Sequence, residues 1–255
     1  MLFRSMKSLL SYQLARIVRR KDLWGILILV AAAQLLLETQ VTPTLYDLPV
    51  NALLVRLLPS GTSQEDVFRS CLTGSKMSIG AIFLLLGASM GGTILCPALR
   101  SHAMLPITAA GYHPRQQSRC CMRLSLMFCA LSILAVLLGE FFLPDSMLAQ
   151  MARTQPVLFL GLELYRLLCY LGCAGLGLLL CRLCLRCEVP LVLGALFLTA
   201  ETLPTLSRIC VVLPSGSISP LLFGTSSVLS MFHGLLESAL ILLLCFLPLG
   251  KEVAL

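Results

Sequence analysis

AGYHPRQQSRCCMR, residues 110–123, is a short basic stretch that separates two apolar runs of an otherwise hydrophobic chain. It contains three arginines and no acidic residue. Gly111 and Pro114 interrupt a membrane helix and favour a turn or a short helix in water. We therefore expect this stretch to be the main cytosolic segment of a membrane protein, at a place where another protein can act on it.

The composition of the whole chain points to the same class of protein. Of the 255 residues, 58% are hydrophobic and only 12% are charged, against about 25% in a soluble domain. Such a chain has too little polar surface to cover a soluble core, so we expect an all-α protein that crosses the membrane several times. The net charge of +7 is then explained by basic residues at the cytosolic membrane edge, and no nucleic-acid partner is expected.

Residues 1–22 are expected to contain an amphipathic helix that lies in the membrane interface. Five apolar residues recur there at helical spacing, and Lys and Arg fill the other side. A plain cytosolic extension is the alternative for this segment. The five apolar residues are Phe3, Met6, Leu10, Leu14 and Ile17.

Six apolar segments are expected to span the membrane as one domain covering residues 1–255, with residues 100–122 as a cytosolic segment between the second and third spans. Thirteen Lys and Arg residues fall on the side of the chain termini and five on the other side. Because basic residues collect in cytosolic segments, both termini are predicted to be cytosolic. The six spans are 23–37, 77–99, 123–143, 157–180, 189–203 and 228–249.

A serine motif in the second span has two interpretations. Gly87-Ala88-Ser89-Met90-Gly91 matches G-x-S-x-G, and with His233 of the sixth span it could serve an intramembrane serine protease. However, the hydrolase motif requires a strand–turn–helix elbow, whereas this one lies in an apolar helical run. Gly87 and Gly91 also form G-x-x-x-G, so we favour a helix-packing role for them.

The twelve cysteines are mostly expected to be reduced packing residues. The spacing Cys181-x-x-Cys184-x-x-Cys187 resembles part of an iron–sulfur run, but it lacks a fourth ligand and a following proline. A helix end at the lipid edge is the simpler account, and no metal is expected. Cys71 and Cys210 fall on the predicted outer side, where a disulfide between them stays open.

Two charged or ionisable pairs lie within the predicted spans. Glu163 and Arg166 share a helix face and are expected to neutralise each other. His233 and Glu237 are one turn apart and deeper in the membrane. Since a charge that faces lipid costs at least about 2.5–3.5 kcal/mol, we expect His233 and Glu237 to line a cavity or a dimer seam.

The chain resembles the membrane subunit of type-2 ABC transporters, the permease class of bacterial exporters and antibiotic-peptide immunity systems. Residues 9–21, LLSYQLARIVRRK, resemble the N-terminal interfacial helix of that family, and six spans follow. Gly92-Thr93-Ile94 resembles the Gly-Thr that opens its cytosolic segment. Gly111-Tyr112-His113-Pro114-Arg115 resembles the turn before its third span, although the acidic residue that usually precedes Gly-Thr is missing.

The resemblance implies an indirect mechanism in the bacterial plasma membrane. Two permease subunits, identical or different, would form the pathway for a peptide, drug or lipid-like compound, and a separate ATPase subunit would supply the energy. The present chain has no nucleotide motif, because Gly74-Ser75-Lys76 lacks the glycine spacing of a P-loop. It would thus be no enzyme itself and would need ATP only through its partner. The candidate docking residues are Gly111, Tyr112, His113, Arg115, Arg119 and Arg123.

Two other classes of function stay open at the level of sequence. One is the intramembrane protease that uses Ser89 and His233, which a Ser89→Ala variant would test. The other is a membrane protein that only assembles with partners or senses them. A neighbouring ATPase gene would favour the permease over both.

Overall fold

The computed structural model describes residues 6–41, 80–99, 114–141, 156–202, 213–217 and 228–247. All regular elements in these ranges are helices, as the composition predicts. The elements are α1 (Met6–Val18), α2 (Lys21–Val41), α5 (Gly80–Met90), the π-helix η2 (Gly91–Leu95), α6 (Cys96–Leu99), α8 (Pro114–Phe141), α10 (Pro156–Cys184), α11 (Glu188–Thr202), the 3₁₀ turn η4 (Pro214–Ser217) and α13 (Val228–Phe246).

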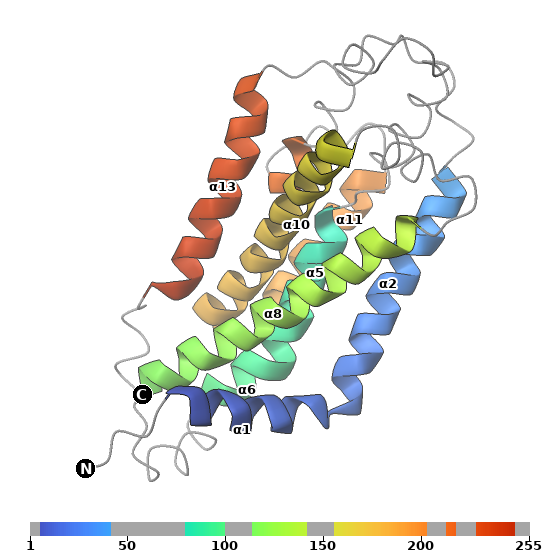
Figure 1. Cartoon of the computed structure of the whole chain (residues 1–255). Coiled ribbons are helices and arrows are strands. Elements are labelled where there is room, and N and C mark those ends of the chain that lie inside the picture. The colour runs from blue at the N-terminus through green and yellow to red at the C-terminus, as the bar shows by residue number, and fades with distance from the viewer. Residues whose placement is uncertain are drawn as a thin grey trace, which may run out of the picture.

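The long helices form a bundle with α10 at its centre. This helix packs against α5, α8, α11 and α13, and α2 stands at the edge against α8 and α5. The short helix α1 lies across one end of the bundle, and α2 rises from its last residues (Figure 1). The core is therefore made where α5, α8 and α10 meet, and α1 closes one end of it.

Small residues let α5 and α10 approach until their backbones touch. A Cβ atom on Gly87 would lie 1.9 Å from the carbonyl oxygen of Ala174. In the other direction, a Cβ atom on Gly177 would lie 2.3 Å from the carbonyl oxygen of Leu84. Neither distance is possible for a real side chain, so glycine at both positions is a condition for this helix pair.

Helix α8 begins earlier than the hydrophobic pattern suggests. The third span was expected to start at residue 123, after a turn or a short helix, but the helix starts at Pro114 and continues unbroken to Phe141. Proline suits the first position of a helix, where its missing N–H would have no partner. Residues 114–122 are therefore the first turns of a long helix, and residues 100–113 lie outside the described part of the chain.

Within the described ranges, two helices are long and apolar enough to cross a membrane. They are Gln116–Gly139 within α8 and Glu163–Cys184 within α10, with mean hydropathies of 2.3 and 2.0 over their most apolar windows. Shorter apolar helices cover Gly80–Leu95, Glu188–Thr199 and Phe232–Phe246. One face of α8 is apolar although it is exposed, through Met127, Leu131, Leu134 and Leu138.

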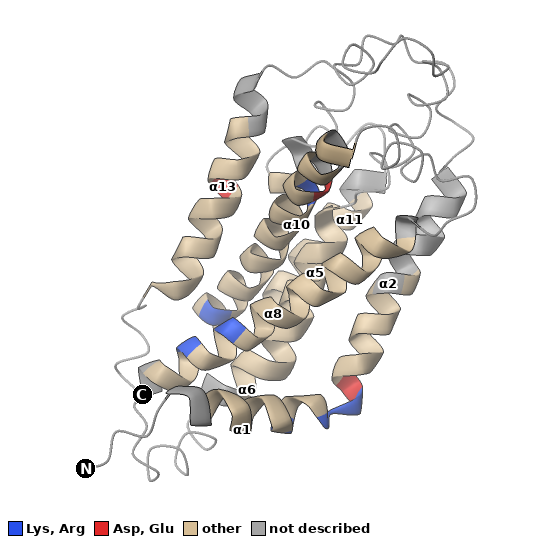
Figure 2. Ribbon diagram, in the orientation of Figure 1, with Lys and Arg blue, Asp and Glu red and all other residues tan. Residues whose placement is uncertain are grey.

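Positive charge gathers at the end of the bundle that α1 crosses (Figure 2). Among the described residues, every Lys and Arg except Arg166 belongs to α1, the α1–α2 corner, the first turns of α8 or the end of α10 and the turn after it. The ion pair of Glu163 and Arg166 lies toward the opposite end of α10. The bundle thus has one basic end, defined here as α1 with the adjoining ends of α2, α8 and α10.

Candidate functional site

The corner between α1 and α2 is held by two hydrogen bonds to the end of α1. The backbone N–H of Arg20 donates to the carbonyl of Ile17 at 2.9 Å, and the indole N–H of Trp24 donates to the carbonyl of Val18 at 2.9 Å. Both bonds satisfy carbonyl groups that a helix C-terminus leaves without an intrahelical partner. The chain can therefore turn from α1 into α2 within two residues.

The α1–α2 corner is one part of the site, and the π-helical turn η2, which lies between α5 and α6, is the other. The N–H of Cys96 donates to the carbonyl of Gly91, five residues back, and the Thr93 hydroxyl donates to Ser89 and Met90 carbonyls at 3.0 and 3.2 Å. In an α-helix the carbonyl of Thr93 would receive the N–H of residue 97. Pro97 has no N–H, so that carbonyl is open to another donor.

Arg20 supplies this donor and connects the two halves of the site. Its Nη1 donates to the carbonyl of Thr93, while Nε and Nη2 donate to the two carboxylate oxygens of Asp22. The Arg20 hydrogen bond lowers the pKa of Asp22 below its ordinary value, so the carboxylate is charged at neutral pH and holds the guanidinium in place. The α1–α2 corner is thereby tied to η2, which continues α5, across 73 residues of sequence.

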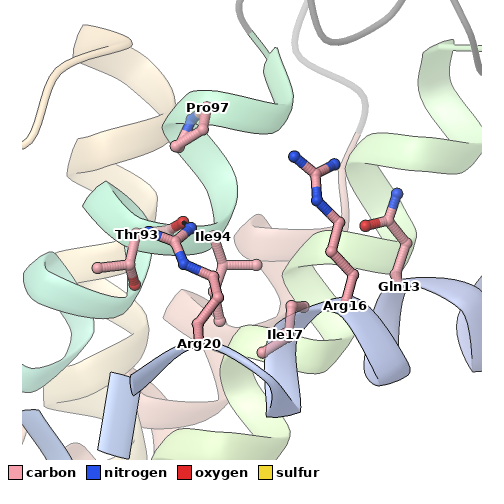
Figure 3. Close-up of a pocket in the computed structure, with 7 residues that line it drawn as sticks. All are labelled: Gln13, Arg16, Ile17, Arg20, Thr93, Ile94 and Pro97. Carbon is pink, nitrogen blue, oxygen red and sulfur yellow. Dashed lines mark hydrogen bonds between the residues drawn. The ribbon is translucent and has the colours of Figure 1, made fainter. Parts of the chain in front are cut away.

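A small cavity of about 30 Å³ lies beside this contact. Figure 3 shows its lining, in which α1 faces η2 and the start of α6. Sites for organic ligands have volumes of about 300–1,000 Å³, so this cavity holds no substrate of that size. The junction is suited to connecting helices and to binding a small polar group. The lining residues are Gln13, Arg16, Ile17, Arg20, Thr93, Ile94 and Pro97.

The face of α1 that packs on the bundle overlaps only partly with the apolar stripe that the sequence places in the membrane interface. Of that stripe, Leu10 is exposed and Leu14 half-buried, whereas Ile17 is buried. The face that packs on the bundle consists of Leu9, Gln13 and Ile17. The position of α1 in the membrane interface stays a prediction, and the bundle buries a glutamine at the central position of the packed face.

The predicted docking residues are distributed over two parts of the chain. Gly111, Tyr112 and His113 lie outside the described residues. Arg115 is the second residue of α8. Arg119 and Arg123 are exposed one turn apart on the same helix, so the face that the described part of α8 presents at the basic end is cationic.

The structure brings Glu163 and Arg166 together inside the bundle. Arg166 Nη1 lies 3.0 Å from Glu163 Oε1, and only 2% of the Arg166 side chain is exposed. The guanidinium also lies 5.7 Å from the centre of the Tyr170 ring, which in turn stacks on Phe83 at 4.3 Å. The predicted pair is thus part of a buried cluster between α10 and α5.

His233 and Glu237 also form a pair, but it lies on the outside of α13. Their Nε2 and Oε1 atoms are 3.6 Å apart, and 64% and 30% of the two side chains are exposed. Exposed apolar side chains, Phe232, Leu236 and Leu240, surround this pair on the same helix.

Ser89 and His233 are separated by α10. The Cys181 thiol donates to the carbonyl of Ala88, beside Ser89, whereas a Cβ on Gly172 would meet Ser238. Cys181 and Gly172 are nine residues apart on α10, which places them about 13 Å apart along its axis. His233, more than one turn before Ser238 on α13, lies further from Ser89 still. The arrangement therefore provides no serine–histidine dyad, while Gly87 and Gly91 face Ala174 and Cys181 of α10.

Eight of the ten cysteines among the described residues are buried, as expected of packing groups. Cys181 is buried and its thiol donates to the carbonyl of Ala88 at 3.3 Å, whereas Cys184 is exposed. In the described part of the chain, no three His, Cys, Asp or Glu side chains are arranged to hold a metal ion. Cys71 and Cys210 lie outside these ranges.

Comparisons with protein-family models, curated proteins and solved structures give no match to this chain. The likeness to type-2 ABC permeases therefore rests on the residues of this chain. The sequence patterns did not predict the bond from Arg20 to Thr93 or the burial of Gln13. One available signal was Pro97, which stands four residues after Thr93 and so leaves its carbonyl open.

Proposed function

We propose that the chain is the membrane-spanning permease subunit of an ABC exporter in a bacterial plasma membrane. In this proposal it has six spans and cytosolic termini, it pairs with a second permease subunit, and it takes its energy from a separate ATPase that binds ATP. The observation that carries the proposal is the junction at the basic end, where one short helix is joined to several long ones.

The exposed surface of the bundle supports a membrane environment. The face of α8 formed by Met127, Leu131, Leu134 and Leu138 would be a large apolar patch in water. In a bilayer the same face is matched to lipid, and the arginines of the first turns reach the headgroups. Among the described residues, Lys and Arg other than Arg166 gather at one end, which supports a cytosolic position for that end.

The connections of α1 support a role in transmitting force. α1 packs on α8 and leads into α2, and the corner between α1 and α2 is tied through Arg20 and Thr93 to η2, which continues α5. Helix α8 also begins in the polar stretch itself, at Pro114. A partner that displaced α1 or the first turns of α8 would therefore move α2, α5 and α8 together.

Replacing both Arg115 and Arg119 with Glu should uncouple the protein from its ATPase. If the first turns of α8 contact an acidic surface, two charge reversals place like charges together and cost several kcal/mol. We expect co-purification of the ATPase and its stimulated ATP hydrolysis in liposomes to fall about tenfold or more.

Arg186→Glu is the matched control, because Arg186 is exposed at the basic end, as Arg119 is, but follows α10. It should leave co-purification of the ATPase and its stimulated ATP hydrolysis within about twofold of the wild type. Unchanged co-purification and hydrolysis in the Arg115/Arg119 variant, with an unaltered elution volume, would refute a docking role for α8.

The second permease subunit is proposed to pack on the exposed side of α13. Placing ionisable side chains such as His233 and Glu237 in contact with lipid is unfavourable, and a second subunit that covers them would remove this cost. Glu237→Leu should therefore reduce the dimer fraction, measured by cross-linking in liposomes, about tenfold or more if the pair is desolvated in the seam. The same change at Glu188, an exposed residue at the start of α11, is the control. An unchanged dimer fraction in Glu237→Leu would rule out this seam.

A further inference from the structure

Gln13, which lines the cavity beside Arg20, has a side-chain hydrogen-bond donor without a partner among the described residues. Gln13 is only 3% exposed, and its Nε2 has no hydrogen-bond partner among these residues. Since buried polar groups in folded proteins almost always have partners, we expect this donor to have a partner from outside the described residues.

A positive charge stands beside this donor. Arg16 makes no hydrogen bond or ion pair with another described residue, whereas the charge of Arg20 is matched by Asp22. Figure 3 shows the side chains of Gln13 and Arg16 extending from α1 next to each other. None of the seven residues that line the cavity is acidic. The described lining therefore offers donors, and a positive charge that no described acidic residue matches, to a ligand that accepts hydrogen bonds.

We propose that this cavity binds a phosphate group, with the headgroup of an anionic phospholipid as its source in the membrane. A guanidinium matches the oxygens of a phosphate in a bidentate manner, and an amide N–H adds a third contact. The cavity of about 30 Å³ admits oxygen atoms but no larger body, so the rest of the lipid must stay outside it. The exposed residues Leu10 and Val18 on the same helix provide an apolar surface for the acyl chains. The inference requires α1 to lie at the membrane surface, and it does not depend on transport.

Lipid binding to the purified full-length protein tests the proposal. Native mass spectrometry in detergent would compare the dissociation constants of phosphatidylglycerol and phosphatidylcholine. For phosphatidylglycerol we expect Arg16→Gln to raise the constant about tenfold, since it removes a charge-assisted pair of hydrogen bonds. Gln13→Glu should have an effect of similar size, because it places a carboxylate against the phosphate.

Arg19→Gln is the matched control, since Arg19 is exposed one residue after α1 and does not line the cavity. It should change the constant less than about twofold. Arg16→Lys keeps the charge and is expected to retain an intermediate affinity, which separates loss of the site from loss of the fold. Equal effects of Arg16→Gln and Arg19→Gln, or equal binding of the two lipids by the wild type, would overturn the proposal.

Competition with inorganic phosphate distinguishes the two sources of the phosphate group. Retention of phosphatidylglycerol in about 10 mM phosphate supports the lipid headgroup, since the acyl chains add apolar contacts that the free ion lacks. Displacement in the wild type, at a concentration that depends on Arg16, supports a site for free phosphate. If neither probe binds in a way that depends on Arg16, no phosphate site exists here.

Discussion

Gly87→Ala is expected to lower the free energy of unfolding by about 3 kcal/mol, at the upper end of the range for overpacked cores. The added methyl group would lie 1.9 Å from the carbonyl oxygen of Ala174, and 2.9 Å from its Cα. A backbone cannot rotate away as a side chain can, so α5 and α10 must separate along their contact. Alanine itself favours a helix over glycine by about 1 kcal/mol, and this gain is smaller than the loss.

Unfolding of the purified protein by SDS, followed by circular dichroism, measures this effect. Gly161→Ala in α10 is the matched control, because a Cβ atom there has no heavy atom within 4 Å. It should leave the stability unchanged or raise it by up to about 1 kcal/mol. If both alanine variants behave alike, the close approach of α5 and α10 does not exist.

Arg166→Met is expected to destabilise the protein by about 3–5 kcal/mol, which is typical for breaking a buried ion pair. The substitution leaves Glu163 largely buried without its cation and removes the group that lies over the Tyr170 ring. Methionine has a similar length, so the loss measures charge and hydrogen bonding more than volume.

The double variant Glu163→Gln/Arg166→Met should recover most of this loss, because a neutral amide no longer needs a cation. Arg186→Met, at an exposed arginine, should stay within about 0.5 kcal/mol of the wild type. The same SDS unfolding experiment provides all three values. An Arg166→Met effect as small as that of Arg186→Met would mean that Arg166 is not buried with Glu163.

The helices were predictable because their hydrophobic runs are long, whereas their ends depend on other chemistry. The start of α8 was placed at residue 123 from hydropathy, although Pro114 is a helix-start residue and no helix breaker follows it before Arg123. Polarity shows where a helix leaves the apolar layer and not where it begins. The π-helical turn at Gly91 has no comparable hydrophobic signature, because it changes the hydrogen-bond spacing and leaves the composition alone.

The candidate site was less accessible from the sequence than the fold. Glu163 and Arg166 are three residues apart, so helical spacing alone predicts their contact. Arg20 and Thr93 are 73 residues apart, and their contact depends on how α1 is set across the bundle. For the same reason Gln13 was overlooked, because a polar residue on α1 is assigned to water until a neighbouring helix covers it.

The unbroken course of α8 has a mechanical consequence. Its 28 residues make a stiff rod about 42 Å long at 1.5 Å per residue. A tilt of about 5° at the basic end would carry the opposite end through roughly 4 Å, which is about two-thirds of the rise of a helical turn. A loop between the polar stretch and the apolar helix would absorb such a movement, whereas a rod works as a lever arm. Small displacements of the arginines would then suffice to change the spacing of helices on the far side of the bundle.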